Sequence, residues 1–451
     1  MDENVLPSKL LNTLYQAADT IRGHDFIHIF SHNDADGVSS AGILACMLQR
    51  LGKEYQVSLL PVLNDGAFQD VAGSLADCII LSDLGASYIE ELEELDRDII
   101  VLDHHFTEMD SDRIVYANPH LYGIDGMTSG CGATLSYMVA VTVDKNNEDK
   151  NNEDLIQLAM AGIAGDRQHI AGLKGLNEII MDGSERFVTR IDGSLIPVGQ
   201  LSNSLYVTTD PYIRGISGSI PAVQNLLKET GIANDASFKD LTEEERYKLS
   251  SLIAIKLLNQ GVSVRTLEET ARTRYLLSDW NLDAESLADI LNACGRTELA
   301  GVGIGMCLGD ENCRELAFEG NRDTKNRVVE AMVALDRRGL SSMDHIQFFD
   351  NMEKGFTGVL CGIAMQFIAD PEKPTIGIGS MDETAKASSR ANWTLLEKGL
   401  DLSVAMRKAA ESVGGSGGGH KIASGGSFPR DQESTFLMNL DAIVGEQLSA
   451  R

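Results

Sequence analysis

The strongest constraint on the fold is a pattern that recurs in the first 105 residues of the 451-residue chain. Short, almost wholly apolar runs each end at an ionisable residue, and stretches with the apolar spacing of helices separate them. The runs cover 26–31, 78–81 and 98–102 and end at His32, Asp83 and Asp103. Continuous apolar strands that alternate with helices are typical of a parallel sheet covered on both faces. The sequence therefore predicts an α/β fold, with any ligand at the carboxyl ends of the strands.

Six ionisable side chains are expected to gather at that edge. The segment HNDADG, 32–37, occupies a strand-to-helix turn, and an apolar helix over 155–163 ends at Gly165, just before an acid. The expected set is His32, Asp34, Asp36, Asp83, His104 and Asp166. Carboxylates packed this closely repel one another and resist burial unless cations lie between them.

This number of ligands exceeds the needs of one ion, so two metal ions that share a carboxylate are predicted. A set rich in oxygen with a minority of imidazole favours Mn²⁺, with Mg²⁺ as the other option, over Zn²⁺. An isolated D-x-D is more often a solvated turn, and a His-His pair is more often a helix start. Four such clusters at the ends of predicted elements are hard to attribute to chance.

Composition limits the partners and the compartment. The net charge of −29 argues against broad, non-specific nucleic-acid binding, so a polyanionic partner must meet a local basic surface. No apolar run is long enough to span a bilayer, and the N-terminus lacks the layout of a signal peptide. The seven cysteines are scattered and include no CxxC pair, which indicates reduced thiols and a cytoplasmic protein without a membrane partner.

Beyond the first domain the signals are mixed. A tandem KNNED repeat at 145–154 predicts an exposed loop without chemistry. Residues 201–295 indicate a mostly helical insertion. The alternation of strand and helix is expected to return with LAGVGIGMCLG at 299–309, a long helix to Arg338 and a strand over TIGIGSM, 375–381. The predicted domains are 1–200, 201–295 and 296–451.

The segment GGSGGGHKIASGG, 414–426, has two interpretations. Five glycines between 414 and 419 fit a flexible linker. They also fit a phosphate cradle, because glycines let backbone N–H groups approach an anion closely. In that case Arg390 and His420 can add charged hydrogen bonds. Residues 386–430 hold seven Lys and Arg against three acids, which supplies a local basic surface and favours the cradle.

These motifs together resemble the DHH phosphoesterase superfamily. HNDADG, Asp83 after an apolar strand, the literal Asp-His-His at 103–105 and AGIAGD ending at 166 are similar to its four motifs. GGGHKIASGG at 417–426 is similar to the signature of the partner domain, DHHA1. NACGR at 292–296, GVGIGMCLGD at 301–310 and the SSR that ends at Arg390 resemble archaeal RecJ-like nucleases of the GINS-associated type.

The resemblance implies a role for each motif residue. His32, Asp34 and Asp83 would hold one metal, and Asp83 would bridge to a second, held with Asp36, His104 and Asp166. His105 would face the substrate phosphate, oriented by Asp103. In the DHHA1 domain the residues expected to bind substrate are Arg390, Gly417, Gly418, Gly419 and His420. The expected catalytic residues are Asp83, Asp103, His104 and His105.

The expected activity is a Mn²⁺- or Mg²⁺-dependent exonuclease that hydrolyses single-stranded DNA, or RNA, by two-metal activation of water. One alternative is a phosphoesterase of short oligonucleotides or of 3′-phosphoadenosine 5′-phosphate. Another is a replisome scaffold that binds GINS, with nuclease activity secondary. Preference for chain length separates the first two, and co-purification with replisome proteins separates the third.

Overall fold

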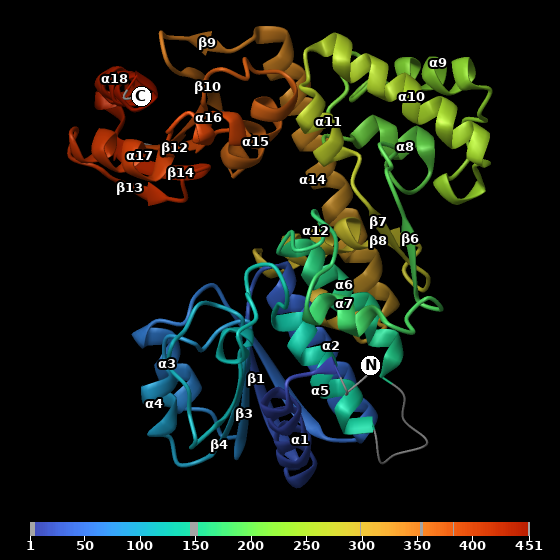
Figure 1. Ribbon diagram of the computed structural model, residues 1–451, viewed down its shortest axis with the longest axis vertical. Helices are drawn as coiled ribbons and strands as arrows, with labels where there is room; N and C mark the ends of the chain where they lie inside the picture. Colours follow the sequence, from blue (N-terminus) through green and yellow to red (C-terminus); the bar gives the residue numbers. More distant parts are fainter. Residues whose placement is uncertain (1–4, 145–151, 298, 352–354, 382, 450–451) are drawn as a thin grey trace. The chain divides into compact units, whose positions relative to one another are not determined.

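The computed structural model describes residues 5–144, 152–297, 299–351, 355–381 and 383–449, which form two compact units (Figure 1). The N-terminal unit contains Met1–Gly193 and Arg272–Arg322, and the C-terminal unit contains Ser194–Ala271 and Asp323–Arg451. This division differs from the three expected domains. The first part of the expected insertion, to Ala271, packs in the C-terminal unit, and its remainder packs in the N-terminal unit.

A five-stranded parallel sheet forms the centre of the N-terminal unit, as predicted, with strand order β2-β1-β3-β4-β5. Its strands are β1 Phe26–His32, β2 Glu54–Leu60, β3 Cys78–Ser82, β4 Asp98–Leu102 and β5 Val115–Ala117. Strand β2 pairs with one edge of β1, and β3 pairs with the other edge. The ends of β1 and β3 therefore meet at the switch in strand order, where parallel sheets bind ligands.

Helices cover both faces of this sheet (Figure 1). One face carries α1 Ser8–Gly23, α2 Ala35–Leu51, α5 Gly132–Asp144 and α6 Ile156–Gly165, with α7 Leu176–Met181 beside α5 and α6. The other carries α3 Asp65–Ala72 and α4 Ile89–Glu93. Neighbouring strand residues face opposite sides of the sheet. Ile80 packs in the core with α1, α2, α5 and α6, whereas Ile79 and Leu81 pack in the core with α3 and α4. Burial on both sides explains why the strands are continuously apolar.

A helical layer and a small sheet complete this unit. Three antiparallel strands form the small sheet, β6 Val188–Ile191, β7 Arg274–Leu277 and β8 Leu282–Asp283. The helices are α12 Ala284–Gly295, α13 Ala300–Cys307 and the first part of α14 Glu311–Arg338. The strand expected over 299–309 is wrong, because α13 occupies it. The glycines of this segment alternate with apolar residues, as in a strand. In the helix, Gly303 and Gly305 instead allow close contact with Cys294 and Cys313.

The end of the KNNED repeat packs against the rest of the N-terminal unit. Residues 145–151 lie outside the described residues. In the last three positions, however, Asn152 is buried and donates to the Asp144 carboxylate, and Asp154 makes a bidentate ion pair with Arg50. For Asn152 the prediction of an exposed loop is wrong, since a polar residue also suits a buried hydrogen-bonded junction, whereas Glu153 is exposed as expected.

The C-terminal unit is built on a six-stranded mixed sheet in the order β13-β14-β12-β11-β10-β9. Its strands are β9 Ser341–Ser342, β10 Gln347–Asn351, β11 Thr375–Met381, β12 Thr384–Arg390, β13 Ser416–Gly419 and β14 Ala423–Pro429. Helices α15 Thr357–Phe367, α16 Trp393–Glu397, α17 Leu402–Glu411 and α18 Glu433–Ser449 pack with it. The expected strand over 375–381 and the expected long helix to Arg338 are confirmed.

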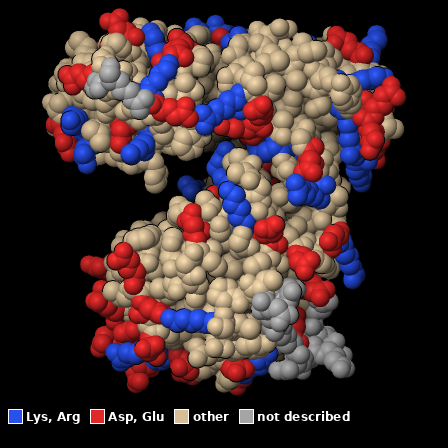
Figure 2. Space-filling model, in the orientation of Figure 1, with Lys and Arg blue, Asp and Glu red and all other residues tan. Residues whose placement is uncertain are grey.

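Four more helices precede this sheet in the same unit. They are α8 Leu201–Val207, α9 Ile220–Thr230, α10 Glu243–Gln260 and α11 Val264–Thr270, which agrees with the mostly helical prediction. In the described part of the chain, no helix combines the length and apolarity needed to cross a membrane. Acidic side chains are prominent over α4 at the edge of the N-terminal unit (Figure 2).

A buried charge network joins β7 and α12 to the segment after α6. Glu285 accepts from Arg272 Nε at 2.8 Å and from Arg274 Nη1 at 3.0 Å, and its Oε1 lies 2.8 Å from His169 Nε2. Burial raises the pKa of Glu285, but His169 and the two arginines outweigh it and hold the pKa well below the ordinary 4.5. The network therefore holds His169, which follows Asp166 in the same segment, against Glu285 of α12.

We expect Glu285→Gln to lower the free energy of unfolding at pH 7 by about 3 kcal/mol, because it removes the negative charge that the buried Arg272 and Arg274 share. The folded-state pKa is depressed, so the stabilisation is complete above pH 4.5 and is lost as the pH falls below it. Urea unfolding at pH 7 and at pH 3.5 should therefore show a smaller difference between variant and wild type at the lower pH. The exposed Glu178→Gln is the control; equal effects of the two substitutions would contradict this account.

Candidate metal centre

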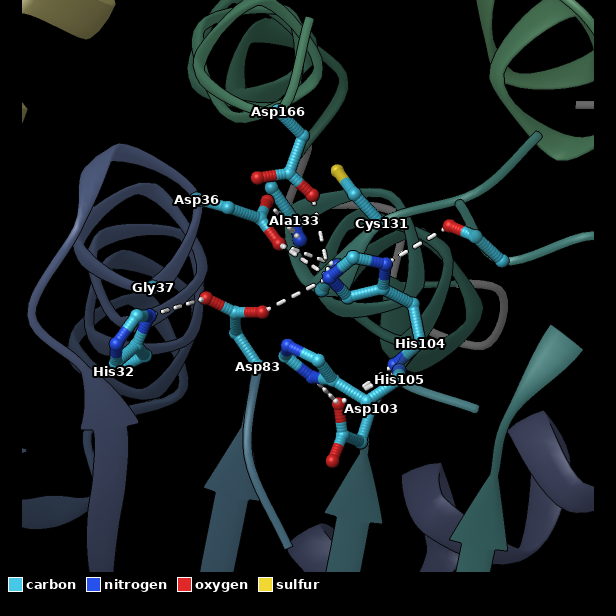
Figure 3. A network of polar contacts seen from close by, with 12 residues as sticks. His32, Asp36, Gly37, Asp83, Asp103, His104, His105, Cys131, Ala133 and Asp166 are labelled. Carbon is cyan, nitrogen blue, oxygen red and sulfur yellow. Dashed lines mark hydrogen bonds and ion pairs between the residues drawn. The ribbon is translucent and has the colours of Figure 1, made fainter. Parts of the chain in front are cut away.

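The carboxyl ends of β1, β3 and β4 bring the predicted residues together (Figure 3). His32 is the last residue of β1, and Asp34 caps α2 by accepting from Gly37 N at 3.1 Å. Asp36 lies in the first turn of α2, and Asp83 follows β3 directly. The cap explains the HNDADG sequence, since Gly37 packs against the His32 carbonyl, where a Cβ would lie 2.1 Å from that oxygen.

One group of ligand atoms contains His32, Asp34 and Asp83. His32 Nδ1 lies 2.9 Å from Asp34 Oδ2 and 3.4 Å from Asp83 Oδ2. One ligand atom from each of these three residues lies within 4.8 Å of the others, a spacing that suits one metal ion. Asp83 has φ 56°, an uncommon conformation for a residue other than glycine. Such strain clusters at functional sites.

A second group surrounds His104. Its Nε2 lies 3.2 Å from Asp83 Oδ1, 3.2 Å from Asp166 Oδ2 and 3.9 Å from Asp36 Oδ2. Its Nδ1 donates to the Gly126 carbonyl at 2.8 Å, which fixes the ring and leaves Nε2 free to act as a ligand. The two oxygens of Asp83 therefore point into two different groups.

The electrostatics show how crowded this edge is. Burial, followed by the charges of Asp83 and Asp166, raises the pKa of Asp36 well above its ordinary range. Burial raises the pKa of Asp166 to about 7, although His104 opposes the shift. The nearby carboxylates of Asp34 and then Asp83 raise the pKa of His32 to about 10. Without cations, protons are drawn to the site to offset the negative charge.

Two buried ligand atoms support a metal fit. Among the described residues, neither His32 Nδ1 nor Asp83 Oδ2 has a hydrogen-bond partner of acceptable geometry, although they face one another. Leaving such atoms unsatisfied costs free energy unless something binds between them. An ion with oxygen and imidazole ligands fits both this gap and the donor set.

His105 lies at the edge of the ligand cluster, where one of its ring nitrogens is within 4.8 Å of ligand atoms of Asp83 and His104. Its Nδ1 lies 2.7 Å from Asp103 Oδ1, and more than half of its side chain, 55%, is exposed. The hydrogen bond that His105 donates to Asp103 raises the pKa of His105 and outweighs burial. Asp103 is itself buried and accepts from Ala86 N and His104 N, so it is a fixed support. This arrangement presents the other nitrogen of His105 to solvent.

Several residues that complete the site carried no signal in the sequence analysis. Gly132 N and Ala133 N at the start of α5 donate to the two oxygens of Asp36 at 2.7 and 2.9 Å. A Cβ on Gly132 would lie 2.7 Å from the Asp83 Cβ. The thiol of Cys131 joins Asp36 and Asp166 in a third group of potential ligands. A glycine and a cysteine far from any acidic motif could be placed there only by the tertiary fold.

The predicted glycines of the C-terminal unit lie in one strand of a β-hairpin and Arg390 ends the neighbouring strand β12, so the linker interpretation is wrong. Gly417, Gly418 and Gly419 belong to β13, which pairs with β14. Gly417 lies against α17 and Gly419 has φ 139°, whereas a Cβ on Gly418 would meet open space. His420 begins the turn after β13, and Ala423 ends that turn at the start of β14. Arg390 pairs with Ala423. The hairpin thus places Arg390 next to the turn that His420 begins.

Comparison with known proteins gives the family. Residues 26–163 match the DHH family, N-terminal domain, and residues 347–446 match the DHHA1 domain. The uncharacterized protein MJ0831 of Methanocaldococcus jannaschii is 31% identical over 436 residues, which are 94% of this chain and 94% of that protein. The chain belongs to the DHH family. The predicted resemblance is thereby confirmed.

More distant relatives of this DHH protein include nucleases. The putative SPbeta prophage-derived single-strand DNA-specific exonuclease YorK of Bacillus subtilis is 24% identical over 187 residues, 39% of this chain and 32% of YorK. The crystal structure of exonuclease RecJ bound to manganese has a TM-score of 0.58 at 16% identity, covering 98% of this chain and 95% of that one. CDC45 from Entamoeba histolytica has a TM-score of 0.59 at 13% identity, covering 97% and 98%. The two structures share the fold of this chain.

We expect Mn²⁺ to raise the melting temperature of metal-free protein, since each ion at 100 times its Kd adds about 2.7 kcal/mol. Asp83→Asn should melt no lower than wild type without metal, because it removes one of the repelling charges and Asn tolerates the positive φ. The variant should show little or no increase with Mn²⁺. Calorimetry with chelator and with Mn²⁺ tests this, and an equal Mn²⁺ effect in both proteins would contradict the shared-ligand geometry.

Proposed function

We propose that this protein is a phosphodiesterase that uses two divalent cations to hydrolyse single-stranded nucleic acid. The observation that supports this most strongly is Asp83, whose two oxygens face two separate groups of ligands. A carboxylate between two ligand groups is the arrangement expected for a pair of cations. His32 and Asp34 would hold one ion, and Asp36, His104 and Asp166 would hold the other, with Asp83 shared.

When bound, the cations supply an activated water and positive charge for the phosphate oxygens. The protein's own residues would position the reactants. The Gly126 carbonyl holds the tautomer of His104, and the start of α5 holds Asp36 through two N–H groups. The exposed nitrogen of His105 would donate to a non-bridging phosphate oxygen, where negative charge grows during the reaction. Asp103 would keep that ring in place.

We propose that the hairpin of the DHHA1 domain binds a second phosphate of the same strand. Gly418 leaves its backbone open to a ligand, and Arg390 next to the turn can donate two hydrogen bonds to a phosphate. Among the described residues, the Arg390 guanidinium donates one hydrogen bond, from Nη1 to the Ser389 carbonyl of its own strand. Binding at two phosphates of one strand favours a polymer over a mononucleotide, which supports an exonuclease. Either Mn²⁺ or Mg²⁺ suits the donor set.

Two other functions make different predictions. A phosphoesterase of short oligonucleotides or of 3′-phosphoadenosine 5′-phosphate would use the same cations but would lose efficiency as the chain grows. A replisome scaffold that binds GINS is supported by the likeness to CDC45. The presence of all six expected ligand residues in one cluster favours an enzyme over a scaffold alone.

The direct test is digestion of end-labelled single-stranded DNA and RNA of graded lengths with Mn²⁺ and with Mg²⁺. We expect processive shortening of long single strands, no attack on duplexes, and loss of more than about 1,000-fold of the rate in Asp83→Asn. Activity confined to di- and trinucleotides would favour the oligonucleotide phosphoesterase. No hydrolysis of any substrate with either metal, together with retention of GINS on a column of this protein, would favour the scaffold.

Arg390→Ala should weaken single-strand binding about ten- to a hundredfold, because a charge-assisted hydrogen bond of roughly 1.5–3 kcal/mol is lost. The logarithmic salt dependence of binding should fall by about one phosphate contact. We expect the rate on a long strand to fall far more than the rate on bis-p-nitrophenyl phosphate, which occupies only the metal site. Lys398→Ala, an exposed cation in the same unit, is the matched control.

Equal losses on the polymer and on the small diester would contradict the role of Arg390 in binding a second phosphate. They would indicate that Arg390 supports the fold or the metal site instead.

A further inference from the structure

The thiol of Cys131 lies beside two acids of the second group, Asp36 and Asp166. One potential ligand atom each from Cys131, Asp36 and Asp166 lies within 4.8 Å of the others. Cys131 is fully buried, and Figure 3 shows its side chain beside those of Asp166 and Asp36. The first group, around His32 and Asp34, contains no sulfur atom. The two sites therefore differ in chemical character.

The backbone on both sides of Cys131 is held in place. Gly130 N donates to Gln168 Oε1 at 3.1 Å, and Gly132 N donates to Asp36 Oδ2 at 2.7 Å. Gln168 is fixed in turn, since its Nε2 donates to the Gly126 carbonyl that also holds His104. The thiol is therefore positioned by the same hydrogen bonds as the metal ligands.

The thiol has few alternative partners. Among the described residues, Cys131 Sγ interacts with the Asp36 carboxylate and lies 3.5 Å from Thr134 Oγ1, which donates its own proton to Asn177 Oδ1 at 2.6 Å. The unsatisfied Oδ2 of Asp83 faces His32 in the first group, but the other oxygen, Oδ1, lies 3.2 Å from His104 Nε2, as does Asp166 Oδ2. The buried thiol therefore lies beside the carboxylates of the second group.

We propose that Cys131 is an additional ligand of the cation that Asp36, His104 and Asp166 hold. This inference rests on the proposed two-cation centre. A thiolate favours Zn²⁺, Co²⁺ and Cd²⁺ over harder ions such as Mg²⁺ and Mn²⁺. The second site should accordingly bind thiophilic ions more tightly than a site of carboxylates and imidazole alone, and such ions should displace Mn²⁺ there first.

Titration of the metal-free protein with Co²⁺ tests the proposal, because a Co²⁺–thiolate bond adds a near-ultraviolet charge-transfer band to the visible bands of the ion. We expect the band in wild type and in Cys313→Ser, which alters another cysteine of the same unit. In Cys131→Ser the band should disappear while the visible bands persist. Competition titrations should show Cd²⁺ affinity reduced about ten- to a hundredfold, with the Mn²⁺ affinity changed much less.

Co²⁺ binding without the charge-transfer band in wild type, or a band that survives in Cys131→Ser, would overturn the role of Cys131 and leave the two-cation centre standing. If neither Co²⁺ nor Mn²⁺ binds wild type, the centre itself is wrong and the proposal fails with it. If Cys131→Ser does not fold, X-ray absorption spectroscopy of zinc bound to the wild-type protein tests whether sulfur is a ligand. Sulfur at about 2.3 Å together with imidazole nitrogen supports the proposal, and a shell of oxygen and nitrogen alone contradicts it.

Discussion

The repulsion among carboxylates at the carboxyl edge of the parallel sheet is the constraint on which the rest of the N-terminal unit depends. Asp36, Asp83 and Asp166 are packed around one imidazole, at distances where like charges oppose burial strongly. The fold offsets part of this cost with the N–H groups at the start of α5 and with the fixed ring of His104. The repulsion that remains can be offset by positive charge, and divalent cations supply the most charge in the space between the carboxylates.

The surroundings of the site are built to keep these groups close. Gly132 and Gly162 allow α5 and α6 to approach the acids, because a Cβ on Gly162 would lie 2.6 Å from Asp36 Oδ1. Beneath the site, the Ser82 hydroxyl donates to Ser31 Oγ, and Ser31 donates to the Gly37 carbonyl, which ties the ends of β1 and β3 together. Small residues and buried hydroxyls thus fix the ligands more firmly than the acidic motifs alone could.

The sequence analysis located what depends on local pattern. The apolar runs predicted β1, β3 and β4, and their last residues predicted His32 and Asp83 at one edge, because parallel strands end together. Features that depend on tertiary packing could not be predicted from the sequence. The glycines of α13 imitate a strand, and Cys131 reaches the site only because α5 begins beside Asp36. The division into two units likewise follows from how 272–322 packs, which no local pattern reveals.

The central claim is that Asp83 joins two cations, and anomalous diffraction from crystals grown with Mn²⁺ tests it most directly. The account predicts two anomalous peaks about 3.5–4 Å apart, with one oxygen of Asp83 bonded to each ion. A single peak, or two peaks that Asp83 does not connect, would contradict it.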